Sequence, residues 1–281
     1  MASSSSGDGY LSSKKRSSAS RSYSPVGQLR NWLELPREVT ASIFSLLVAT
    51  EILKTIRFVC KSWFDICKDP LVWRKIYMYN NGEGVLNMDL DRICREAVNR
   101  SCGNLVYVNV EYFGNDGLLK YITNRCGRIK RLRLACCYYL SVEGLIEAIA
   151  KLPLLEELDL LLCSFSVVPL EAVGRYCPRL RSLKLNRQCE EWLLDGNAEA
   201  IVIAKHMPEI RHLQILGNSM TNMGLQAILD GCPHLESLDL RQCFSLDLEG
   251  KLGERCTEQI KYLRLPHEST DDFEFRVCHD D

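Results

Sequence analysis

The sequence contains no apolar run of membrane-spanning length, and its first residues lack the long apolar core of a secretory signal peptide. Its net charge is only −1 over 281 residues, so no global field favours nucleic acid or an anionic membrane as a partner. No Cys-x-x-Cys occurs, and no histidine lies at zinc-ligand spacing from a cysteine, which argues against a structural metal. Gly-x-Ser-x-Gly and glycine-rich phosphate loops are also missing. The sequence therefore contains no motif of a catalytic site or of a cofactor-binding site, and we expect neither an enzyme nor a cofactor.

One short pattern recurs seven times between residues 102 and 265. Each copy has an apolar starter, a few spacers, a leucine-like residue and then Leu-x-Leu, as in CPRLRSLKL and CPHLESLDL. The starters are Cys102, Cys126, Leu152, Cys177, Met207, Cys232 and Cys256, so successive starters are 24, 26, 25, 30, 25 and 24 residues apart. A fixed period in the twenties with this pattern is the signature of a leucine-rich-repeat solenoid.

Each repeat predicts one strand and one helix, which makes the fold class α/β. Leu238 and Leu240 alternate with polar residues, as in a short strand with one buried face. Leu225 and Ile228 recur at helical spacing, and the Gly-Cys-Pro sequence at 231–233 ends that helix. No unit can bury its apolar side alone, so the repeats must stack into a curved surface of the kind that binds macromolecules.

Seven of the 14 cysteines fall in phase with the repeats, which favours small buried side chains in a reducing compartment over a disulfide framework. The in-phase residues are Cys102, Cys126, Cys137, Cys163, Cys177, Cys232 and Cys243. In three repeats, a cysteine is the third residue after Leu-x-Leu, and we expect it to pack under the turn that leaves the strand. These are Cys137, Cys163 and Cys243. Asn218 takes that place in the Met207 repeat, where we expect it to bond the turn backbone. The expected location is cytoplasmic, nuclear or both.

Residues 1–29 form a serine-rich segment with few side chains to bury, and we expect it to be disordered. A solvated tail, a weak nuclear-import patch at 14–16 and a plastid transit peptide are the three interpretations of this segment.

Residues 31–77 predict four helices. Pro36 suits the first turn of the first helix, Thr50 the N-cap of the second, and Asp69 the start of a fourth that reaches Ile76. About 40 residues without a disulfide or a metal are marginally stable alone. Their surplus apolar surface must therefore be buried elsewhere, partly against the repeats and partly against a partner.

This segment resembles the F-box motif. The matching elements are LPRE at 35–38, Ile43 with Leu47, VCKSW at 59–63 and DPLVW at 69–73. An F-box followed by leucine-rich repeats is similar to the F-box/LRR class, most of all to its plant members. The expected organisation is F-box helices at 30–78, a connecting helix within 79–101, about seven repeats at 102–266 and an acidic tail at 267–281.

The resemblance implies a non-catalytic substrate-recognition subunit of a Skp–cullin–F-box ubiquitin ligase. Its F-box would dock on a Skp-family adaptor, and through it on a cullin-RING ligase. By correspondence with the motif, the docking residues would be Leu35, Pro36, Ile43, Leu47, Val59 and Trp63, although Val59 and Trp63 also suit internal packing. An F-box/LRR scaffold or ligand sensor that acts without a cullin is the alternative.

The polar residues that alternate with the strand leucines would line the concave face and bind an unidentified protein substrate. The candidates are Arg131, Arg133, Glu157, Asp159, Lys184, Trp192 and His212. The two arginines suit a phosphate or an acidic peptide, and equally suit Glu157 and Asp159 in the next repeat. The repeat from Cys177 to Met207 is four to six residues longer than the others, and the excess falls within 187–197. Trp192 lies in this segment and is either an exposed anchor for a partner or a cap on its own repeat.

Overall fold

The computed structural model describes residues 32–79, 89–163, 167–186 and 196–273. These belong to two compact units, Met1–Leu35 and Pro36–Asp281. The described part of the first is the short 3-10 helix η1 (Trp32–Glu34). The second contains all other elements and is described below by itself.

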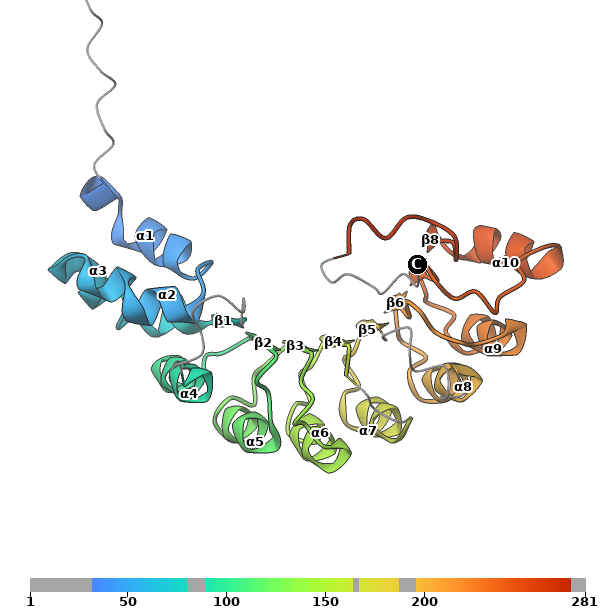
Figure 1. The fold of residues 1–281 in the computed structure, drawn as a ribbon, viewed down its shortest axis with the longest axis horizontal. Coiled ribbons are helices and arrows are strands. Elements are labelled where there is room, and N and C mark those ends of the chain that lie inside the picture. Colours follow the sequence, from blue (N-terminus) through green and yellow to red (C-terminus); the bar gives the residue numbers. More distant parts are fainter. Residues whose placement is uncertain (1–31, 80–88, 164–166, 187–195, 274–281) are drawn as a thin grey trace, which may run out of the picture. The chain divides into compact units, whose positions relative to one another are not determined.

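The second unit is an eight-stranded parallel sheet with strands in chain order, alternating with helices (Figure 1). The strands are β1 (Lys75–Met78), β2 (Tyr107–Glu111), β3 (Arg131–Ala135), β4 (Glu157–Leu161), β5 (Ser182–Asn186), β6 (His212–Gln214), β7 (Ser237–Asp239) and β8 (Tyr262–Arg264). The helices between them are α4 (Leu90–Arg100), α5 (Asp116–Arg125), α6 (Val142–Ile149), α7 (Val168–Tyr176), α8 (Gly196–His206), α9 (Asn222–Gly231) and α10 (Lys251–Gln259). The strands line the inside of an arc and the helices its outside, which confirms the predicted solenoid.

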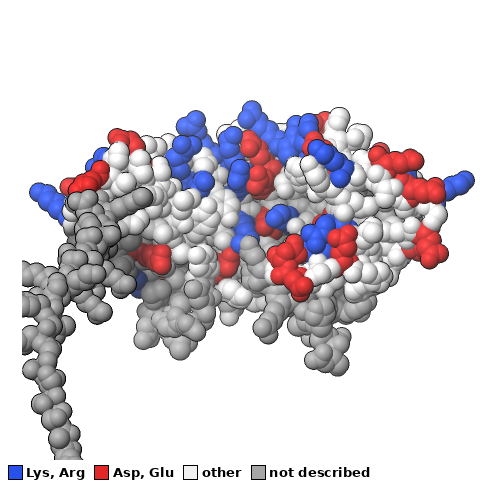
Figure 2. Space-filling view, turned by 90° about the horizontal axis from the view of Figure 1, so that it is seen from above, with Lys and Arg blue, Asp and Glu red and all other residues white. Residues whose placement is uncertain are grey.

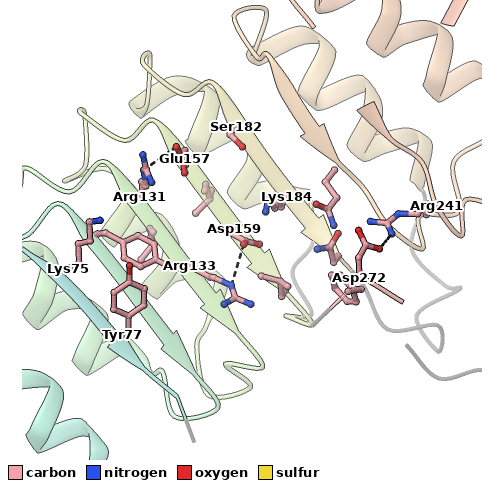
Figure 3. Close-up of a pocket in the computed structure, with 17 residues that line it drawn as sticks. Lys75, Tyr77, Arg131, Arg133, Glu157, Asp159, Ser182, Lys184, Arg241 and Asp272 are labelled. Atoms are coloured by element: carbon pink, nitrogen blue, oxygen red, sulfur yellow. Dashed lines mark hydrogen bonds and ion pairs between the residues drawn. The ribbon is translucent and has the colours of Figure 1, made fainter. Parts of the chain in front are cut away.

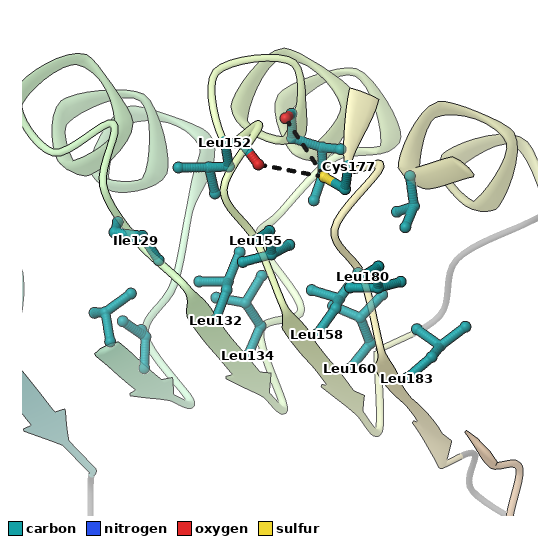
Figure 4. Close-up of a cluster of buried hydrophobic side chains, with 14 of the residues drawn as sticks. Ile129, Leu132, Leu134, Leu152, Leu155, Leu158, Leu160, Cys177, Leu180 and Leu183 are labelled. Atoms are coloured by element: carbon teal, nitrogen blue, oxygen red, sulfur yellow. Dashed lines mark hydrogen bonds between the residues drawn. The ribbon is translucent and has the colours of Figure 1, made fainter. Parts of the chain in front are cut away.

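The leucines of the repeat form one continuous core between sheet and helices (Figure 4). Leu158 and Leu183 occupy register positions on neighbouring strands, and both are almost fully buried. Leu155 is buried beneath the turn that leads into its strand. Burial of each such side chain contributes roughly 1.5–3 kcal/mol, so the stack of repeats, and no single repeat, holds the fold together.

The cysteines of the turns also bond the backbone of the preceding repeat. Cys243 Sγ lies 3.1 Å from the carbonyl oxygen of Ile215, and Cys177 Sγ lies 3.5 Å from that of Leu152. Asn218 behaves as predicted, because its Oδ1 accepts a hydrogen bond of 2.8 Å from the backbone N–H of Met220. The cysteines therefore tie adjacent repeats together, and Asn218 stabilises its own turn.

Cys102 departs from the prediction that all in-phase cysteines are buried. It is exposed and has a left-handed backbone with φ of 49°. The buried place belongs to Ser101, whose Oγ lies 3.6 Å from Cys126 Sγ. The turn from α4 into β2 passes through Cys102 and Gly103, both with positive φ, which carries the Cys102 side chain outward.

We expect thiol mapping to separate these environments. Of the cysteines in the described segments, Cys102 should be the first that a maleimide modifies at pH 8, since it is exposed. Cys94, Cys177 and Cys243 should react only on unfolding, because burial raises the pKa of each thiol to about 12 and leaves little thiolate. Peptide mass spectrometry after timed labelling measures each site separately. Early modification of Cys177 in folded protein would contradict the packing described here.

The helices before β1 are α1 (Arg37–Phe44), α2 (Ala49–Lys54), the 3-10 helix η2 (Ile56–Phe58), α3 (Lys61–Ile66) and the 3-10 helix η3 (Pro70–Trp73). Pro36 and Val48 are the N-caps of α1 and α2, so Thr50 lies inside the second helix instead of capping it. The predicted fourth helix is wrong beyond Trp73, because Ile76 belongs to β1.

The fourth segment becomes a strand because Ile76 and Met78 are both buried and alternate with Lys75 and Tyr77. β1 pairs with β2 over four residues, so it provides the first strand of the solenoid sheet. Trp73, two residues before β1, is fully buried and donates a hydrogen bond of 2.9 Å from Nε1 to the carbonyl of Cys67. The helical segment and the repeats thus share one core.

Among the described residues, no single helix is long and apolar enough to cross a bilayer. In the same described residues, the helical stretches Arg37–Phe44 and Ala49–Phe58 together have the length and composition of a membrane span, but the chain bends by 120° between them.

Candidate functional site

Exposed valine, leucine and phenylalanine side chains concentrate in the helical segment before β1. They are Val39, Leu46, Phe58, Val59, Phe64 and Leu71. In the described solenoid that follows, most of the exposed large hydrophobic residues are tyrosines, six of eleven. Exposed apolar surface of this density on a small group of helices is typical of a protein-binding surface.

Cations flank two of these aromatic rings. The Arg57 guanidinium lies 4.7 Å from the ring centre of Phe58, and Lys68 Nζ lies 4.1 Å from that of Phe64. Arg57 Nη1 is also 3.4 Å from a carboxylate oxygen of Glu96 on α4. These contacts give the apolar surface a polar rim, the usual anatomy of a protein interface.

The predicted docking residues divide into two groups. Leu35, Pro36 and Val59 are exposed. Ile43, Leu47 and Trp63 are half-buried and pack against the core, with the Trp63 ring edge-on to Phe44 at 5.2 Å between ring centres. Sequence reasoning missed the exposed residues Val39, Leu46, Phe58, Phe64 and Leu71. Their signal was an apolar side chain next to a position that packs in or against the core, as in the Leu46–Leu47 and Leu71–Val72 pairs.

On the concave face, the outward residues of the strands form two rows in register. The first row runs Lys75, Tyr107, Arg131, Glu157, Ser182, His212, Ser237 and Tyr262. The second runs Tyr77, Asn109, Arg133, Asp159, Lys184, Gln214, Asp239 and Arg264. Each predicted candidate on a strand therefore lies in one of these rows.

The two arginines of β3 face the two acids of β4. Arg131 Nε lies 3.1 Å from Glu157, and Arg133 Nε lies 3.4 Å from Asp159 (Figure 3). Arg133 also reaches Glu111 at 2.9 Å and is largely buried. Of the two roles open to these arginines, the structure shows the internal one. Both ion pairs lie within the sheet, and the Arg133 charge is enclosed between two carboxylates.

A hollow of about 460 Å³ opens over β1–β6 and reaches Arg241 and Asp272 (Figure 3). Lys75, Arg131, Glu157, Ser182 and Lys184 line it, together with Tyr77 and Tyr107, whose ring centres are 5.1 Å apart. A second hollow over β5–β8 shares Lys184 and also contains His212. The face can therefore receive a long polar segment that crosses the strands.

Arg241, which sequence reasoning missed, holds the segment after β8 against the second hollow. It is buried and lies 2.7 Å from Asp239, and it also pairs with Asp272. The hydrogen bonds that Arg241 donates to Asp239 raise the pKa of Arg241, and the one that it donates to Asp272 lowers the pKa of Asp272. Arg264 reaches Asp272 at 3.3 Å. Arg241 follows the strand leucines like any turn residue, so the repeat pattern gave no sign of this role.

Trp192 and most of the 187–197 excess lie outside the described residues, as do residues 1–29 and the end of the acidic tail. Among the residues that are described, no group of three His, Cys, Asp or Glu side chains is placed to hold a metal ion.

Comparison with known proteins bears on both halves of the chain. Residues 32–79 match the F-box-like family. F-box/LRR-repeat protein 23 of Arabidopsis thaliana is 48% identical over 94% of this chain, which spans 61% of the length of that protein. The F-box protein SKIP19 of the same organism is 44% identical over 91% of this chain and 84% of its own length. Among solved structures, a chain from the yeast Rad7–Elc1 complex matches with 18% identity and a TM-score of 0.47, over 56% of this chain and 40% of that chain.

Proposed function

Because the chain belongs to the family of F-box/LRR-repeat proteins, we propose that it is the substrate-recognition subunit of a Skp–cullin–F-box ubiquitin ligase. The helices before β1 dock on a Skp-family adaptor, and the concave face binds the protein to be ubiquitinated. The chain itself performs no chemistry in this role. Ubiquitin transfer belongs to the cullin-RING partners.

The observation that carries the proposal is the exposed apolar surface of the F-box-like segment. Leu46, Phe58 and Val59 are each more than half exposed, although the same segment contributes Phe44, Ile52 and Leu53 to the core. Burial of each exposed side chain in an interface is worth roughly 1.5–3 kcal/mol before the costs of association. A few of them suffice for a stable complex with one adaptor.

The attachment of this segment to the solenoid also supports the role. β1 pairs with β2, and Trp73 is buried in the shared core, so the adaptor surface and the substrate surface belong to one compact unit. A rigid connection holds a bound substrate in a fixed orientation to the adaptor. Transfer between two held partners gains from the restricted geometry.

Affinity purification of the tagged chain from cells tests the proposal and separates it from the scaffold alternative. We expect an adaptor of the Skp family and a cullin to co-purify in comparable amounts, because one docking surface recruits both. The full-length Leu46→Asp, Val59→Asp variant, which keeps β1 and the buried Trp73, serves as the control and should recover neither. Recovery of the adaptor without any cullin would favour a scaffold or ligand sensor instead.

A further inference from the structure

We propose that the concave face binds an extended, negatively charged protein segment that runs across the strands. This inference rests on the proposed function and specifies the chemistry of its substrate site. It differs from the expectation for Arg131 and Arg133, because the charges available to a partner belong to other residues.

The charge on this face contrasts with the near-neutral chain. Seven cationic side chains line the two hollows, against four carboxylates. The cations are Lys75, Arg131, Arg133, Lys184, Arg241, Lys261 and Arg264, and the carboxylates are Glu157, Asp159, Asp239 and Asp272. Viewed toward the concave face, Lys and Arg side chains gather along one long edge (Figure 2). A face with this excess of positive charge attracts acidic partners over basic ones.

The ion pairs show which cations can respond to a partner. Four of the cations already form ion pairs with carboxylates of the chain. They are Arg131, Arg133, Arg241 and Arg264. Among the described residues, Lys75, Lys184 and Lys261 make no ion pair. Lys75 lies in β1, Lys184 in β5 and Lys261 directly before β8, so the three lysines are spread along the whole face. Lys184 is the one common to both hollows.

The chain already holds one acidic segment of its own in this manner. Arg241 Nη1 donates to the carbonyl of Ser269 at 2.9 Å and pairs with Asp272. Arg264 Nη2 donates to the same carbonyl at 3.3 Å. Cations of the concave face thus bind both the backbone and the carboxylate of a non-helical segment. A partner segment would meet the same kind of contact further along, at Lys184 and Lys75.

The spacing of the strands gives the length of the segment. Parallel strands lie about 4.8 Å apart, so the seven intervals from β1 to β8 span about 34 Å. An extended chain rises about 3.3 Å per residue, and about ten residues therefore cross the face. Acidic side chains near the first, middle and last of these would reach the three lysines.

Fluorescence anisotropy with the purified full chain tests the inference. The probes are fluorescein-labelled (Glu-Gly)6, its phosphoserine analogue (pSer-Gly)6, its basic counterpart (Lys-Gly)6, and a single-stranded DNA with six phosphates. We expect both acidic peptides to bind, with affinity that falls as salt rises, and (Lys-Gly)6 not to bind. If (pSer-Gly)6 binds more tightly than (Glu-Gly)6, the substrates are phosphorylated proteins. If the two peptides bind equally, the substrates carry segments rich in carboxylates. Both results support the inference.

The variant Lys75→Glu with Lys184→Glu should bind (Glu-Gly)6 at least about tenfold more weakly, since each attraction becomes a repulsion. Lys205→Glu with Lys251→Glu is the matched control, because those lysines are exposed on helices α8 and α10. Unchanged affinity in the first variant, an equal loss in the control, or equally tight binding of DNA or (Lys-Gly)6 would overturn the inference. Adaptor binding, measured on the same protein preparations, tests the proposed function separately. If the adaptor binds but neither acidic peptide does, this inference is wrong and the proposed function stands.

Discussion

Exchanging Leu46 and Val59 together for aspartate is expected to weaken adaptor binding by about a hundredfold or more. Each exposed apolar side chain contributes roughly 1.5–3 kcal/mol on burial, and 1.4 kcal/mol corresponds to a factor of ten in the dissociation constant. Aspartate also brings a charge into an interface that would otherwise be dry. Isothermal titration of the purified chain with a Skp-family adaptor measures the change.

The variant should remain folded, because both side chains are more than half exposed and contribute little to the core. Ile201→Asp with Met223→Asp provides the matched control, since these residues are exposed on the solenoid helices α8 and α9. We expect the control to bind adaptor like the unmodified chain. Wild-type affinity in the Leu46 and Val59 variant would place the adaptor surface elsewhere on the chain.

Replacing Trp73 by alanine should lower the free energy of unfolding by about 3–5 kcal/mol, the range for a buried tryptophan. The side chain is fully buried and gives the carbonyl of Cys67 its hydrogen bond, so the substitution removes packing and leaves a buried acceptor unpaired. Urea unfolding followed by circular dichroism measures the loss. The exposed Trp32 offers the control, where alanine should change stability by less than about 0.5 kcal/mol.

The effect should also be local, because a solenoid transmits energy mainly between neighbouring repeats. Hydrogen exchange should accelerate in α2, α3 and α4 and change little in β6–β8. Uniform acceleration across the sheet would show that the unit unfolds as a single cooperative block. Unchanged stability would contradict the shared core of the helical segment and the repeats.

The strands and helices of the repeats could be predicted from the sequence because burial alternates with a short, regular period. Leu158 and Leu183 lie where the Leu-x-Leu pattern places them. β1 was missed because its pattern, Ile76 and Met78, contains no leucine and follows directly after the DPLVW element. Its strand conformation depends on pairing with β2, some 30 residues later in the chain. No local sequence pattern predicts that pairing.

The partners of individual side chains were harder to predict from the sequence than the helices and strands. The sequence left two roles open for Arg131 and Arg133, and only the register of β3 with β4 places Glu157 and Asp159 opposite them. The exposure of Cys102 depends on left-handed backbone in its turn, although Cys102 precedes its strand by the same number of residues as Cys126 precedes the next strand. Among the F-box positions, the motif could name residues but could not divide them into exposed and half-buried ones.

The central claim is that this chain brings bound proteins to a ubiquitin ligase through its apolar helices. The most direct measurement compares ubiquitin remnants on proteins captured by the unmodified chain and by the Leu46→Asp, Val59→Asp variant, with the proteasome inhibited. Both chains should capture the same proteins through the concave face, and the remnants should be enriched only with the unmodified chain. Equal ubiquitination of the proteins that both chains capture would contradict the claim.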